Sequence, residues 1–207
     1  MQLLLLAVLS AATLGLAGLA WAQRRRRRVL ARIADKHGMR FAAHDPFDVA
    51  RRYGQCELIQ AGHSAYAENV IYGHVGRWLL RAFDCHVEAG HGPHRLTRRL
   101  SVVAADVDFP CAPALVWRGG QAHGLSVLPA TPLHLADGWQ GCGEPTKVQR
   151  LIRSWPARGP QTVCIQAFGT TLLFWADRRL GPPALVRQLR ATAGCLDRVD
   201  AQAARKR

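Results

Sequence analysis

A hairpin pattern in residues 77–109 decides the fold: RWLLRAFDCHVEAGHGPHRLTRRLSVVAADVDF. Both arms are rich in aliphatic, aromatic and β-branched residues, which fit the half-buried surface of a pleated sheet. Between the arms, residues 91–94 (HGPH) combine Gly and Pro in the manner of a turn. Two such arms on either side of a turn predict two neighbouring antiparallel strands.

Further strands and helices are predicted on both sides of this hairpin. The helix at residues 45–53 has Asp45 as its cap and Pro46 at its first position. A second short helix is predicted at residues 148–155. The remaining strands are predicted at residues 56–62 (CELIQAG), 114–120 (ALVWRGG) and 162–178, where two strands flank Gly169.

The C-terminal segment, residues 182–199, has the periodicity of an amphipathic helix. One apolar stripe is formed by Leu185, Leu189, Ala193, Leu196 and Val199. Helices at both ends of a run of strands are typical of an α+β fold. We therefore predict an N-terminal transmembrane helix, then a mainly antiparallel, curved and roll-like sheet, which the C-terminal amphipathic helix closes.

The N-terminus predicts a membrane anchor. Leu3 to Ala22 is a run of twenty residues without a charge, and as a helix it would be about 30 Å long, the thickness of a bilayer core. A cleaved signal peptide has a positive n-region and a shorter apolar stretch, and both are missing here. The alternative is a domain that is secreted after cleavage at Ala22, because Ala20-Trp21-Ala22 fits the small-x-small pattern of a cleavage site.

Five consecutive arginines, Arg24 to Arg28, follow the apolar run. Arginine next to a span resists translocation, which predicts an inner-membrane protein with its N-terminus outside and its C-terminal domain in the cytoplasm. At an anionic inner leaflet each arginine would contribute roughly 1 kcal/mol of attraction. The formal net charge of +14 also raises an alternative, nucleic-acid binding through the arginine-rich segment. We disfavour nucleic acid as a partner because the run is not interleaved with base-stacking aromatics.

These features divide the chain into four parts. We predict a transmembrane anchor at 1–23, a basic juxtamembrane helix at 24–38, a soluble α+β domain at 39–200 and a basic tail at 201–207. The helix is expected to continue to about Lys36, since Gly38 is a favourable C-terminal stop. Small residues at four-residue spacing predict self-association within the membrane. They are Ala7, Ala11 and Gly15.

The histidines and cysteines give a weak metal pattern and no cofactor motif. Six cysteines are widely spaced without a C-x-x-C pair, and a reducing cytoplasm would leave them as thiols. His86, His91 and His94 are close enough in sequence to share a metal ion. Cys85 and His86 would point to opposite faces of a strand, so a polar hairpin tip without metal is the simpler interpretation. We expect no cofactor.

The segment ENVIYGHVGRWLLRAFD, residues 68–84, resembles a pattern in uncharacterised bacterial proteins with one N-terminal span and an α+β domain. In that pattern N-V-[LI]-x-G is followed about ten residues later by F-D. Asn69, Gly73, Phe83 and Asp84 stand at the matching positions, whereas Cys85 replaces the usual aromatic residue. The resemblance implies a membrane-tethered domain and no activity. From the residues themselves, Asn69 and Gly73 predict turns, and Asp84 predicts a hydrogen bond to a neighbouring backbone.

Taken together, the sequence favours a single-pass membrane protein whose domain is a binding or interaction module without enzymatic activity. Its partner would be a protein or a small molecule. The alternative enzyme is a metal- or thiol-dependent hydrolase built around Cys85, His86, His91 and His94.

Overall fold

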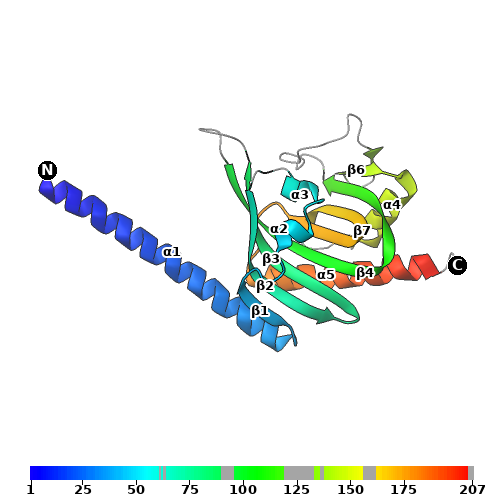
Figure 1. The fold of residues 1–207 in the computed structure, drawn as a ribbon, viewed down its shortest axis with the longest axis horizontal. Helices are drawn as coiled ribbons and strands as arrows, with labels where there is room; N and C mark the ends of the chain where they lie inside the picture. Colours follow the sequence, from blue (N-terminus) through cyan, green and yellow to red (C-terminus); the bar gives the residue numbers. More distant parts are fainter. Residues whose placement is uncertain are drawn as a thin grey trace.

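The computed structural model describes residues 1–60, 62, 64–89, 96–118, 133–135, 138–155 and 162–204. These residues contain five helices and seven strands in an α+β arrangement, drawn in Figure 1. The helices are α1 (Gln2–Lys36), α2 (Val49–Arg52), α3 (Glu57–Gln60), α4 (Pro145–Ser154) and α5 (Pro182–Ala204). The strands are β1 (Arg40–His44), β2 (Ser64–Val75), β3 (Trp78–Ala89), β4 (Leu96–Arg118), β5 (Leu133–His134), β6 (Trp139–Gly143) and β7 (Thr162–Ala176).

Helix α1 is continuous through the apolar run and the arginines, as predicted. Its first part projects from the domain as a free rod (Figure 1), and it is long and apolar enough to cross a membrane. It ends in a Schellman motif: Gly38 has a φ of +65°, and its N–H donates to the Asp35 carbonyl. The Met39 N–H donates to the Ala34 carbonyl at 2.8 Å, which turns the chain sharply into β1.

The sheet is antiparallel and curved. Its order is β1-β2-β3-β4-β6-β5, and β7 also pairs with β4. The predicted hairpin is confirmed, since Leu80 to Ala89 in β3 pair with Ala105 to Leu96 in β4. The sheet is unclosed, and closure by the C-terminal helix is not confirmed: α5 lies across one face (Figure 1).

Two apolar clusters lie on the two faces of the sheet. One joins the buried end of α1, the side chains of α4 and α5, and the strand residues that face them. In it the predicted stripe of α5 is confirmed, with Leu185, Leu189 and Leu196 almost fully buried. The other cluster lies beneath α2 and α3 and contains Phe83 and Trp117. Because both faces are covered, the central strands carry apolar residues on both sides.

Several local predictions were wrong at element boundaries. Residues 57–60 form a helical turn and not a strand, and β4 and β7 are each single long strands. Asp45 does accept hydrogen bonds from the Phe47 and Val49 N–H groups, but the helix begins only at Val49. In β7, Gly169 has a φ of +55° and interrupts the ladder without ending the strand.

Candidate functional site

The arginine run does not act as a single unit, because two of its members bind the domain. Arg24, Arg25 and Arg28 are exposed, whereas Arg26 has a side chain only 10% exposed. Arg26 grips Asp84 with two hydrogen bonds, from Nε to Oδ2 at 2.8 Å and from Nη2 to Oδ1 at 2.7 Å. The interpretation of all five as headgroup contacts therefore needs correction: Arg26 is already bound to a carboxylate inside the protein.

Asp84 is the centre of a buried polar network. Its side chain is 1% exposed and also accepts hydrogen bonds from Asn69 Nδ2 at 3.0 Å and Ser101 Oγ at 3.2 Å. Ser101 Oγ accepts the Leu180 N–H, and the Leu180 carbonyl accepts Arg26 Nη1. A buried charge must be paired and fully hydrogen-bonded to be tolerated. This network meets that need and joins α1, three strands and Leu180 in the segment that precedes α5.

The N-V-I-x-G and F-D segments build this network through a β-bulge. The register places Glu68 opposite Asp84 and Ile71 opposite Ala82, so two residues of β2 face the single residue Phe83. Asn69 is the first residue of the bulge, with a φ of +55°, a left-handed conformation that Asn tolerates. The bulge directs its side chain to Asp84. The prediction of Asn69 as a turn residue is thus replaced by a bulge inside a strand.

Gly73 and Phe83 have structural roles on the two faces of the sheet. Gly73 lies in β2 with a φ of +150°, and a Cβ there would lie 3.1 Å from the Met39 Cα. Its lack of a side chain lets the chain that leaves α1 pass close over the strand. Phe83 is buried in the opposite cluster and stacks on Tyr53, with ring centroids 6.4 Å apart. Gly73 is not in a turn, which corrects the prediction.

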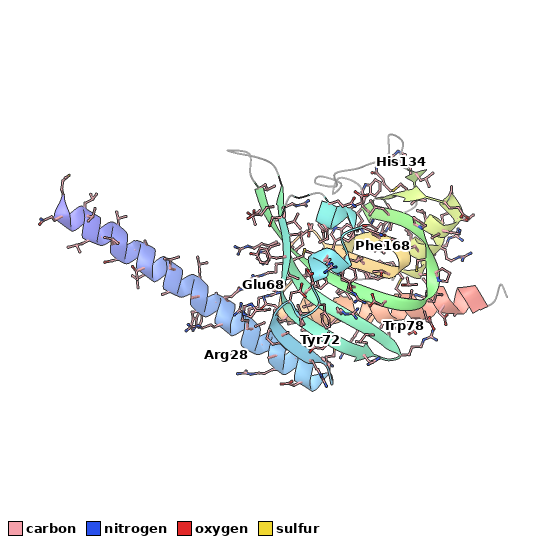
Figure 2. All side chains as sticks on the ribbon, in the orientation of Figure 1. Arg28, Glu68, Tyr72, Trp78, His134 and Phe168 are labelled. Atoms are coloured by element: carbon pink, nitrogen blue, oxygen red, sulfur yellow. The ribbon has the colours of Figure 1, made fainter. Side chains whose placement is uncertain are left out.

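A second polar group lies beside the first, on the same face of β2 and β3. Gln23 Nε2 donates to both oxygens of Glu68, at 2.7 and 2.8 Å, and Arg27 Nη2 lies 3.6 Å from Glu68 Oε2. On its other side Glu68 Oε1 is 3.0 Å from His86 Nε2, and His86 Nδ1 is 3.1 Å from the Tyr66 hydroxyl. Arg28 lies on α1 and Glu68 on the strand beside it (Figure 2). Gln23 and Arg27, through their contacts with Glu68, therefore also hold α1 against the sheet.

We expect this docking to weaken in acid. Burial raises the pKa of Glu68, but hydrogen bonds from Gln23 and His86 outweigh it, and the net pKa is lowered. A carboxyl whose pKa is lowered by folding stabilises the folded state at pH values above its unfolded pKa of about 4.3. That stabilisation is lost as the pH falls through the pKa of the folded state. Urea unfolding of wild type and Glu68→Gln between pH 6 and 3 measures this contribution. The advantage of wild type should shrink below about pH 5; a constant difference contradicts the expectation.

The metal and thiol hypotheses find no support in the described residues. No group of three or more potential metal ligands occurs among them, and His91 and His94 lie outside the described part of the chain. His86 is 3% exposed and engaged by Glu68 and Tyr66. Burial raises the pKa of the Cys85 thiol to about 12, so it stays protonated at neutral pH and is a poor nucleophile. As predicted, Cys85 and His86 face opposite sides of the sheet.

A cavity of about 180 Å³ lies at the other end of the domain, between the bend of β4, β7, α4 and the end of α5. Phe109, Leu151 and Leu172 contribute its apolar walls, and Lys147 and Arg150 bring positive charge to it. Lys147 is paired with Glu144 at 2.6 Å, whereas Arg150 forms no ion pair within the described residues. An apolar hollow beside a guanidinium suits a small molecule with an apolar body and an acidic head.

Two prolines interrupt the ladder of β4 beside this hollow. Pro110 and Pro113 lack an N–H group and cannot donate to the ladder. Between them the pairing of β4 with β7 is irregular, with register shifts on both sides of Cys111. This site was not among the sequence predictions, although two prolines within an apolar strand pattern are a signal that could have indicated it.

Comparisons with known proteins extend only to the fold. No model of a known protein family matches the sequence, and no curated protein matches it. A solved structure, the mycobacterial trehalose monomycolate transport factor A (TtfA), is similar with a TM-score of 0.60 and 13% sequence identity. The match covers 86% of this chain and 94% of the TtfA chain. At this identity the likeness shows a shared fold and carries no information about ligand or activity.

Proposed function

We propose that this protein is a single-pass membrane protein whose α+β domain is a non-enzymatic binding module, held rigidly by its own membrane helix. The observation that carries this proposal is the bidentate contact of Arg26 with buried Asp84. A flexible tether would leave a domain free to rotate about its anchor. Here the helix is continuous up to Lys36, and its residues 23, 26 and 27 bind the sheet, which favours one rigid unit.

The proposed orientation places the N-terminus outside and the domain in the cytoplasm, at the inner membrane. Its support is the arginine run on the C-terminal side of the apolar segment. Secretion after cleavage at Ala22 is less favoured, because the apolar run has no positive n-region before it and is long enough to span a bilayer. A phosphatase reporter fused after Arg207 tests the orientation: it should be inactive in the periplasmic assay, and activity there would overturn the cytoplasmic assignment.

The cavity between β4 and α4 is the proposed ligand site of the module. Its volume of about 180 Å³ is slightly larger than an engineered 150 Å³ apolar cavity that binds benzene. A chain of a few methylenes or one ring would therefore fit, with a carboxylate or phosphate at Arg150. Helix α4 presents Lys147, Arg150 and Leu151 at helical spacing of three and four, which puts charge and apolar surface side by side.

Short amphiphiles test this ligand site without the complication of micelle formation. Hexanoate and hexyl phosphate should bind the protein in lipid nanodiscs, measured by saturation-transfer NMR with hexanol as the uncharged reference. The Arg150→Gln substitution should weaken hexanoate binding by about ten- to a hundredfold, since a charge-assisted hydrogen bond is worth about 1.5–3 kcal/mol. Arg153→Gln, one turn away on the same helix, serves as the matched control. Equal binding of hexanoate by wild type and Arg150→Gln would remove the proposed site.

Two further hypotheses, nucleic-acid binding and self-association, stay predictions. Nucleic-acid binding by the arginine run is disfavoured further, because Arg26 and Arg27 are engaged by carboxylates of the domain. Self-association through Ala7, Ala11 and Gly15 is compatible with the free first part of α1. The described role of TtfA in trehalose monomycolate transport is not transferred to this chain, because the likeness concerns the fold alone.

A further inference from the structure

We propose that the end of the sheet formed by Ser64, Glu88 and Leu96 rests in the anionic headgroup layer of the membrane that α1 crosses. The proposal rests on the membrane anchor of the proposed function and adds a second contact with the bilayer. We call this part of the molecule the membrane-facing end. It is made by the start of β2, the end of β3 and the start of β4, where Ser64 pairs with Glu88 and Ala89 pairs with Leu96.

The direction of β2 relative to α1 carries the argument. Along α1, Gln23 binds Glu68 of β2, and beyond the end of α1 Met39 lies against Gly73. The residue numbers of helix and strand increase together, so β2 begins on the side toward which the apolar part of α1 extends. Figure 1 shows the same arrangement, with β2 splaying away from the free rod as it nears its start.

The position of the membrane-facing end along the membrane normal follows from the rise per residue of strand β2. Ser64 precedes Glu68 by four residues, which is at most about 13 Å along the strand. The component along α1 is smaller because the strand splays outward. Glu68 is level with Gln23, directly after the apolar run that ends at Ala22. A headgroup layer occupies only about 5–8 Å beyond the hydrocarbon core, so a strand that runs from Glu68 toward the membrane brings this end to the depth of the headgroups.

The surface chemistry of the membrane-facing end fits that position. Outside α1, the large hydrophobic side chains exposed in the described residues are Tyr66, at 51%, and Leu96, at 60%, and both lie here. Arg99 is exposed beside them, and Arg98 is half-buried. Tyrosine is favoured at membrane interfaces, and each arginine near an anionic leaflet adds roughly 1 kcal/mol of attraction. The exposed Arg24, Arg25 and Arg28 of α1 continue the same positive surface.

A fluorescent probe on the full-length protein in phosphatidylglycerol-containing vesicles tests the proposal. The Leu96→Cys variant is labelled with a maleimide dye at pH 7 for a short time. Burial raises the pKa of the Cys56, Cys85 and Cys195 thiols to about 12, so they react slowly. Cys111 and Cys142 are partly exposed, with pKa values that burial also raises, and the wild-type chain provides the labelling blank for them. Thr170→Cys is the control: Thr170 is exposed beside Thr171, which pairs with Asp106, about 33 Å along β4 from Leu96.

Lipids that carry a nitroxide on the headgroup should quench the dye at position 96 at least threefold more strongly than the dye at position 170. Equal quenching at the two positions overturns the proposal. Vesicle flotation distinguishes failure of this proposal from failure of the membrane anchor. A chain that floats with the vesicles but shows equal quenching is anchored without a second membrane contact. A chain that does not float refutes the anchor itself. Thr97→Cys, also exposed, repeats the measurement if Leu96→Cys disturbs folding, as monitored by circular dichroism.

Discussion

The Asp84→Asn variant is expected to lose about 3–5 kcal/mol of unfolding free energy, because it leaves the Arg26 guanidinium buried without its counter-charge. Asp84 accepts hydrogen bonds from Arg26, Asn69 and Ser101, and an amide at this position would aim its own donors at theirs. The loss is measured by urea unfolding of the full chain in detergent, followed by tryptophan fluorescence. A loss near 3–5 kcal/mol is a large part of the stability of an ordinary domain.

Two comparisons make this expectation specific. Arg28→Met removes an exposed charge from the same run and should change stability by less than about 0.5 kcal/mol. In a cycle with Arg26→Gln, the double variant should cost less than the sum of the two single variants, since both break the same contact. Additive costs, or an Asp84→Asn cost no larger than that of Arg28→Met, would show that the ion pair does not hold α1 against the sheet.

The contact between Arg26 and Asp84 also illustrates which features the sequence could predict and which it could not. The apolar run, the arginines and Gly38 are local signals, and they predicted an unbroken helix with its correct end. The docking of Arg26 is nonlocal, because Asp84 lies 58 residues away. Nothing in RRRRR distinguishes Arg26 from Arg25 until the register of the helix against the sheet is known. Lipid contact was therefore assigned to all five residues alike.

The same division applies to the sheet. The strand-like composition and the turn residues of residues 77–109 were sufficient to predict the β3–β4 hairpin, because its two strands follow one another in the sequence. The short helical turn at Glu57–Gln60 was mistaken for a strand because four residues are too few to show a helical period. The bulge at Asn69 depends on pairing with Phe83 across the sheet, so its residues were identified while their role was not.

A second large effect is expected at Gly73, where the chain leaving α1 passes over β2. The Gly73→Ala variant should lose roughly 3 kcal/mol of unfolding free energy. Part of this is backbone strain, because a φ of +150° is a conformation that L-residues rarely adopt, at a cost of about 1–3 kcal/mol. The rest is overpacking, of similar size, because the new Cβ would lie 3.1 Å from Met39 Cα and 3.3 Å from its side chain.

Gly76→Ala separates the two contributions. Gly76 has a φ of +64°, but a Cβ there meets no atom within 4 Å, so this variant carries strain of about 1–2 kcal/mol without overpacking. Only Gly73→Ala should displace Met39, whose N–H closes the end of α1 by donating to Ala34. Hydrogen exchange at the Met39 amide should accordingly accelerate in Gly73→Ala and stay unchanged in Gly76→Ala. Equal stability losses with unchanged exchange in both would mean that β2 tolerates a side chain beneath the chain leaving α1, and that the close approach does not fix the helix to the sheet.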